Sequence, residues 1–108
     1  MFARKYRLPA SVRLEQPLII SSPFFTLRIA RNNSADNRYG FIVSKKVDKR
    51  AVVRNNIKRR IRTCMETLHP KLVSGHDVLF IVKKEAIEQE TEVLSMTIKK
   101  LLQERKLL

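Results

Sequence analysis

The chain has 108 residues and a formal net charge of +13. It has no run of 18 or more apolar residues, which excludes a membrane-spanning helix, and one cysteine with two histidines supplies neither an internal disulfide nor a zinc-type ligand set. Residues 1–65 hold 16 basic and 3 acidic side chains, whereas residues 66–108 hold 7 of each. We therefore expect a polyanionic partner, no membrane partner and, from the single cysteine, a cytoplasmic location.

The first half of the chain predicts an irregular segment followed by strands. Residues 1–17 are basic and contain prolines that oppose a long helix. Residues 18–20 predict a short strand, and residues 24–30 and 38–45 predict two longer ones with alternating faces. Because the loop RNNSADN between these two is short, we expect them to pair antiparallel.

The second half predicts two amphipathic helices around a buried strand. Apolar residues at spacings of three and four predict a helix over residues 51–68 and another over 91–106, and the run DVLFIV predicts a strand over 77–82. The fold class is therefore α+β, with residues 1–108 as a single domain. The expected buried positions are Val53, Ile57, Ile61, Cys64 (an inert core thiol), Met65 and Leu68 on the first helix, and Leu94, Ile98, Leu101 and Leu102 on the second.

The segment KRAVVRNNIKRRIRTCM, residues 49–65, carries the clearest chemical signal. It contains 7 basic residues and no acid, so its like charges repel one another along the helix. A phosphate backbone would relieve that repulsion, because each cation displaces a condensed counterion. A merely solvated basic face is the alternative, although such faces usually mix both signs. The polar residues that border the apolar stripe of this helix, which we call the polar arc, are Arg54, Asn55, Lys58, Arg59 and Arg62.

Aromatic residues in the predicted strands could offer flat surfaces to unstacked RNA bases. Tyr39 and Phe41 share a strand face with Lys45 and are better candidates than Phe24 and Phe25. Core packing is the alternative role for each of these rings.

The side chains contain no catalytic constellation. Only three acids precede residue 66 and none is at dyad spacing with another, His76 and Asp77 point to opposite faces of a strand, and no Gly-rich phosphate loop is present. We expect neither catalytic nor metal-binding residues, so any reaction is supplied by another component.

The segment RYGFIVSKKVDKRAVVRNNIKRRIR, followed by LVSGHDVLFIVKKEA, resembles the protein subunit of bacterial ribonuclease P. The resemblance implies a two-layer α/β sandwich with a small mixed sheet and a left-handed βαβ crossover, similar to domain 2 of ribosomal protein S5. It also implies a monomer in a 1:1 complex with the catalytic RNA. That RNA, with Mg²⁺, would remove the 5′ leader of precursor tRNA as the catalytic part of an endoribonuclease.

The resemblance assigns binding roles by position. Two lysines match a basic pair near the leader-binding cleft, and Arg28 falls roughly where the family often has a cleft tyrosine. For the leader and tRNA we therefore expect contacts from Arg28, Tyr39, Phe41, Lys45 and Lys46. For the catalytic RNA we expect contacts from Arg50, Arg54, Asn55, Lys58, Arg59 and Arg62.

The sequence departs from the family pattern in two places. Asn56 stands where the motif usually has arginine and Thr63 where an acid is usual, so one RNA contact is missing or is supplied by Arg60. The stretch EQPLIISSPFF replaces the family's N-terminal helix, which leaves the leader cleft without one wall. A ribosomal or other structural RNA-binding protein remains the alternative, and a DNA-binding protein is disfavoured because the basic helix lies between strands.

Overall fold

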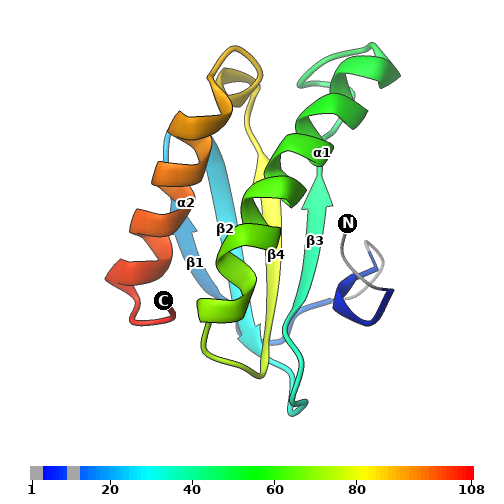
Figure 1. The fold of residues 1–108 in the computed structure, drawn as a ribbon. Coiled ribbons are helices and arrows are strands. Elements are labelled where there is room, and N and C mark those ends of the chain that lie inside the picture. The colour runs from blue at the N-terminus through cyan, green and yellow to red at the C-terminus, as the bar shows by residue number, and fades with distance from the viewer. Residues whose placement is uncertain (1–3, 10–12) are drawn as a thin grey trace.

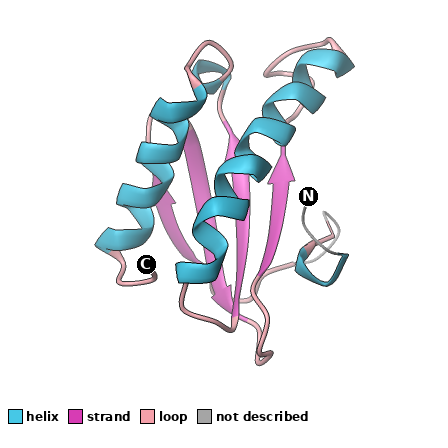
Figure 2. Cartoon of the chain, in the orientation of Figure 1, coloured by secondary structure: helices cyan, strands magenta, loops and turns pink. Residues whose placement is uncertain are grey.

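The structure, a computed structural model, describes residues 4–9 and 13–108, and it has one layer of sheet and one of helices (Figures 1 and 2). Both α-helices cover the same face of the sheet. The elements, besides three short 3₁₀ turns, are β1 (Leu18–Ser21), β2 (Phe25–Arg31), β3 (Arg38–Ile42), α1 (Ala51–Leu68), β4 (His76–Val82) and α2 (Thr91–Glu104).

The two helices pack through the apolar stripes expected from the sequence. On α1 all the expected stripe residues are buried except Val53, which is half-buried. The four expected residues of α2 are also buried, although this helix ends at Glu104 and the chain then turns. Cys64 is buried beneath α2, with its Sγ 3.8 Å from the Thr91 carbonyl oxygen, and burial raises the pKa of its thiol. Its predicted position in the core is confirmed.

The predicted pairing of β2 with β3 is wrong. The strand order is β1-β2-β4-β3, so β4 lies between β2 and β3, antiparallel to the first and parallel to the second. The physical reason is burial: β4 is apolar on both faces, and Val78, Leu79 and Phe80 are all buried. A strand of this kind is stabilised most in the interior of a sheet, where both of its faces are covered.

The connection from β3 through α1 to β4 is left-handed. In Figure 1 both strands run upward, α1 lies in front of the sheet, and the chain moves from β3 on the right to β4 on the left. Most parallel βαβ units have the opposite hand. The crossover expected from the family resemblance is therefore present.

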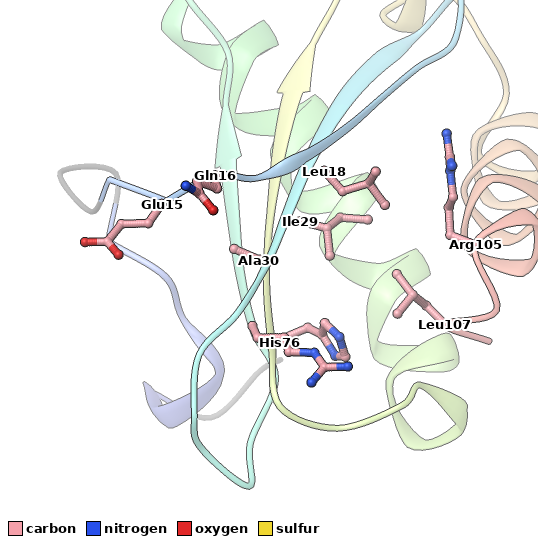
Figure 3. Close-up of a pocket in the computed structure, with 9 residues that line it drawn as sticks. Glu15, Gln16, Leu18, Ile29, Ala30, His76, Arg105 and Leu107 are labelled. Atoms are coloured by element: carbon pink, nitrogen blue, oxygen red, sulfur yellow. The ribbon is translucent and has the colours of Figure 1, made fainter.

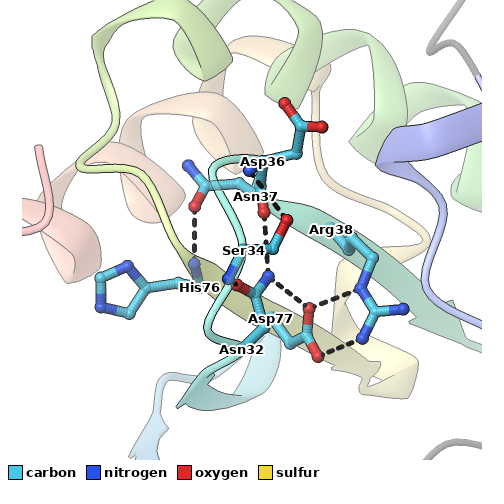
Figure 4. Close-up of polar contacts among 7 residues, drawn as sticks. All are labelled: Asn32, Ser34, Asp36, Asn37, Arg38, His76 and Asp77. Atoms are coloured by element: carbon cyan, nitrogen blue, oxygen red, sulfur yellow. Dashed lines mark hydrogen bonds and ion pairs between the residues drawn. The ribbon is translucent and has the colours of Figure 1, made fainter.

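The loop between β2 and β3 spans the beginning of β4 and binds it through polar side chains (Figure 4). Arg38 donates two hydrogen bonds to the Asp77 carboxylate, at 2.8 and 2.7 Å, and Asn32 donates a third at 2.9 Å. Asn37 accepts from the His76 backbone N–H at 2.8 Å. Burial by itself raises the pKa of Asp77, but the hydrogen bonds from Arg38 and Asn32 outweigh it and leave the pKa below its ordinary value. We call Asn32, Asn37, Arg38 and Asp77 the Asp77 cluster.

The described part of the N-terminal segment packs against β3. The Leu8 backbone N–H donates to the Tyr39 carbonyl at 2.8 Å, and the Leu8 side chain is buried. Gly40 makes this approach possible, because a Cβ at that position would lie 3.1 Å from the Leu8 carbonyl oxygen. Within residues 4–9 and 13–17 the chain forms a 3₁₀ turn at Arg4–Tyr6, an isolated β-bridge from Arg7 to Tyr39 and otherwise irregular structure.

Candidate nucleic-acid interface

Basic side chains gather where the chain leaves β3 and enters α1. Lys45 and Lys46 lie in a turn beyond the end of β3, and exposed or half-buried cations continue along the first three turns of α1. The strand predicted over residues 38–45 is shorter than expected, because β3 ends at Ile42 and Lys45 is therefore not part of the strand. We call this region the basic surface; it consists of Lys45, Lys46, Lys49, Arg50, Arg54, Lys58, Arg59 and Arg62.

Two arginines of the basic surface hold the turn that precedes α1. Arg50 donates to the Asp48 carboxylate from Nε at 3.1 Å and Nη2 at 2.9 Å, and its backbone N–H donates at 2.8 Å. These bonds lower the pKa of Asp48 to about 2. Arg54 donates from Nη1 to the carbonyls of Asp48 and Lys49, at 2.9 and 2.8 Å. The turn that presents the lysine pair is thus fixed by side chains from the helix start.

The cations further along α1 have a different environment. Asn55 and Arg59 are exposed and Lys58 is half-buried. Among the described residues, neither Lys58 nor Arg59 lies within 4 Å of a carboxylate, and the same is true of Lys45 and Lys46. Positive charge held on a rigid helix without a protein counter-ion favours an external polyanion.

Phe41 lies beneath the basic surface as part of the core. Its ring stacks on that of Phe80 with centroids 5.3 Å apart, and the Arg62 guanidinium carbon lies 5.5 Å from its centroid. The ring is half-buried. Arg62 is therefore oriented by a cation–π contact, and Phe41 keeps only part of its surface for a base.

The prediction that Tyr39 offers a stacking surface is wrong. Its ring is only 2% exposed, because it faces the helices and contacts the His69 ring edge-on at a centroid distance of 5.5 Å. The Tyr39 hydroxyl lies 2.7 Å from His69 Nδ1 in a hydrogen bond, and burial raises the pKa of Tyr39 to about 12. The Phe25 ring is fully buried and equally unavailable.

The structure does not bring the five expected leader residues together. Arg28 is exposed, and it points away from the helices because its neighbours Leu27 and Ile29 are buried beneath them. Phe41 lies on the helix-covered face instead, and the lysine pair lies beyond the end of β3. Arg28 is thus separated by the sheet itself from Tyr39 and Phe41.

Arg60 has a structural role that the sequence reasoning missed. Its Nε donates to Thr91 Oγ1 at 3.0 Å, and its Nη2 donates to the Gln89 carbonyl. These bonds tie α1 to the segment that leads into α2, so Arg60 is not available to take over RNA binding from the position of Asn56. A signal was present: at roughly 100° per residue, Arg60 lies about 40° from Cys64 and is therefore at the border of the buried stripe.

The described residues also limit other kinds of site. No group of three or more His, Cys, Asp or Glu side chains among them could hold a metal ion. Within the same residues, no helix is both long enough and apolar enough to cross a membrane.

A basic helix that crosses left-handedly over a four-stranded mixed sheet defines a small α+β protein suited to holding a polyanion. A family model described as ribonuclease P matches residues 12–106. The chain therefore belongs to the ribonuclease P protein family.

Relatives and solved structures support this assignment. The chain is 39% identical over 79 residues to the ribonuclease P protein component of Cyanothece, covering 73% of this chain and 60% of the relative. It is 35% identical over 109 residues to that of Chloroflexus aggregans, covering 98% and 80%. The Staphylococcus aureus RNase P protein structure superposes with a TM-score of 0.74 at 26% identity, covering 85% of this chain and 84% of that one. The chain spans only 55% to 60% of the length of the relatives from Cyanothece and Microcystis aeruginosa.

Proposed function

We propose that the chain is the protein subunit of ribonuclease P. In this role it binds the catalytic RNA and the 5′ leader of precursor tRNA, and it assists the endonucleolytic step that gives the mature tRNA 5′ end. The observation that carries the proposal is the basic surface, where Lys58 and Arg59 have no carboxylate within 4 Å among the described residues and lie on a helix inside the range that the family model matches.

The proposed division of labour leaves the cleavage to the RNA. The described residues do not fit a metal ion, so we assign Mg²⁺ to the RNA subunit and derive no protein step through it. The protein's contribution is positive charge placed among crowded phosphates, which lowers the concentration of Mg²⁺ that the RNA needs. We further propose that residues 1–108 act as one RNA-binding domain, in a 1:1 complex with the RNA in the cytoplasm.

The proposed contacts follow from exposure and pairing. Asn55, Lys58, Arg59 and Arg62 face the catalytic RNA, while Arg50 and Arg54 hold the adjoining turn and present their remaining donors beside it. For the leader we retain Lys45, Lys46, Arg28 and the accessible part of Phe41. Tyr39 is withdrawn from this group because its ring is covered.

The test is reconstitution with a ribonuclease P RNA at low Mg²⁺, following cleavage of precursor tRNA. We expect the protein alone to leave precursor tRNA intact and the mixture to cleave it faster than the RNA alone. Specific cleavage at the tRNA 5′ end without the RNA would contradict the division of labour. A protein that gives no stimulation and co-purifies with ribosomal RNA would indicate the structural RNA-binding alternative.

A further inference from the structure

A second basic site lies at the opposite end of the sheet from the basic surface. A groove of about 810 Å³ opens between the β1–β2 edge and the chain that follows α2 (Figure 3). It lies at the end of β2 and the start of β4, whereas Lys45 and Lys46 follow the end of β3, which runs parallel to β4. The two regions are therefore separated along the strand direction.

Three nitrogen-bearing side chains from separate elements line this groove. Arg31 ends β2 and pairs in register with His76, the first residue of β4, and Arg105 directly follows α2. The His76 Nδ1 atom lies 3.3 Å from the Val73 carbonyl oxygen, and this contact holds the ring at the groove wall. Among the described residues, neither arginine lies within 4 Å of a carboxylate.

Apolar side chains form the rest of the lining. Leu18 and Leu107 lie beside the cations, with Ile29 between them (Figure 3). Leu18 is 42% exposed, so its side chain is accessible at the border of the groove. An apolar surface in a groove lined by two guanidinium groups fits a nucleotide, whose base needs cover and whose phosphates accept several hydrogen bonds.

The wall formed by the C-terminal residues is held in place. Lys106 adopts a left-handed conformation with φ of 58°, and this turns the chain back so that the Leu107 N–H donates to the Leu102 carbonyl at 3.0 Å. The Leu107 carbonyl then accepts from the Val73 N–H at 2.9 Å. The groove is thus built from anchored backbone on the side where Arg105 enters.

We propose that this groove binds one nucleotide of a single-stranded RNA segment. Arg31 and Arg105 contact its flanking phosphates, and Leu18 and Leu107 cover its base. The chemistry is that of a nucleoside phosphate, and the choice of RNA as its source rests on the proposed function. The protein would then contact RNA at two opposite ends of its sheet.

The test is an NMR titration of the ¹⁵N-labelled full chain with an eight-residue oligouridylate, with uridine monophosphate and inorganic phosphate in parallel. We expect shifts at the amides of Arg31, His76 and Leu107 that persist in Arg59→Gln. In the double variant Arg31→Gln, Arg105→Gln, the same amide shifts should require about tenfold more oligouridylate. The matched control, Lys99→Gln with Lys100→Gln, removes the same charge from the exposed side of α2 and should change affinity less than about twofold.

A variant that is expected to strengthen binding makes the test independent of folding damage, because damage to the fold would weaken binding. Glu15 also lines the groove, so Glu15→Gln should tighten oligouridylate binding about twofold. Absence of shifts at the groove amides, or equal weakening by the Lys99 and Lys100 control, would overturn the proposal. If uridine monophosphate bound to the groove and the oligouridylate did not, the ligand would be a free nucleotide and not a segment of RNA. Loss of cleavage stimulation with intact groove shifts would count against the proposed function alone.

Discussion

The Asp77 cluster and the basic surface use the same type of side chain for opposite purposes. Arg38 places its guanidinium on a buried carboxylate and thereby fixes a loop to the central strand. Lys58 and Arg59 lie on a helix face where the described residues supply no carboxylate. A cation matched by the protein stabilises the fold, whereas an unmatched one is left for a ligand. Charge counts from sequence alone do not separate these two uses.

The largest expected effect comes from the inner face of α1, opposite the basic surface. Ile61 is fully buried, so Ile61→Ala should lower the free energy of unfolding by about 2–5 kcal/mol through reduced burial and a cavity. Urea denaturation measures this change. A decrease below about 1 kcal/mol would show that α1 does not depend on this face for its packing.

The next effect belongs to the Asp77 cluster. Asp77→Ala leaves Arg38 and Asn32 without their acceptor and should cost about 1–3 kcal/mol of stability. RNA affinity, measured at a temperature where the variant is folded, should stay unchanged. Asp48→Ala is the control, since its carboxylate lies at the surface beside Arg50 and its removal should cost less stability. A fall in RNA affinity for Asp77→Ala would break the distinction between the two regions.

The same carboxylate predicts a pH dependence. Because the pKa of Asp77 is below its ordinary value in the folded protein, its contribution is present above the unfolded pKa of about 3.9 and is lost as the pH falls through the lower, folded value. Unfolding curves between pH 6 and pH 2 should therefore show stability falling at the acidic end. The fall should be shallower in Asp77→Ala, and identical slopes in both proteins would contradict the assignment.

Two adjacent arginines of α1 give a closely matched comparison. Arg59→Ala should leave the melting temperature almost unchanged and weaken binding to ribonuclease P RNA, with a salt dependence shallower by about one counterion for each phosphate interaction removed. Arg60→Ala should do the reverse, since it removes the bonds to Thr91 and Gln89. Destabilisation by Arg59→Ala would mean that the polar arc is structural.

The smallest expected effect concerns the leader. The described N-terminal residues form no α-helix, and the cations proposed for leader contact are not gathered on one face. Each base stack on an aromatic ring is worth roughly 1–3 kcal/mol, so without such stacking the holoenzyme should prefer precursor over mature tRNA only weakly. Affinities for precursors with leaders of increasing length measure this preference. A large gain with leader length that persists at high salt would show an intact stacking cleft.

Local patterns predicted the helices well and the sheet order poorly. The stripe from Ile57 to Leu68 lies within the 18 consecutive residues of α1, and the structure confirms it. The error in pairing β2 with β3 arose because a short loop suggested a hairpin, while the strand that separates them comes 34 residues after the end of β3. Which strand becomes central depends on burial of both faces, and that is settled by the whole sheet.

For the candidate site, the sequence located the basic surface but could not assign each side chain. The alternation along β3 places Tyr39 and Phe41 on one face and Gly40 on the other, but it does not say which of these faces the helices cover. Arg60 and Arg59 look alike in a charge count and differ by one helical step of roughly 100°. Such a step decides whether a guanidinium meets a neighbouring segment or solvent.

The insertion of β4 between β2 and β3 has a consequence for synthesis. The chain makes β2 and β3 well before the strand that joins them, so both keep an unpaired edge until residues 76–82 have been added. At roughly 5–20 residues per second, the delay between the end of β3 and the end of β4 is about 2–8 s. Within that interval, once residue 65 has been added, the nascent chain carries its entire excess of positive charge. Like charge on the emerging segment keeps neighbouring copies apart and so protects the open strand edges from pairing with one another.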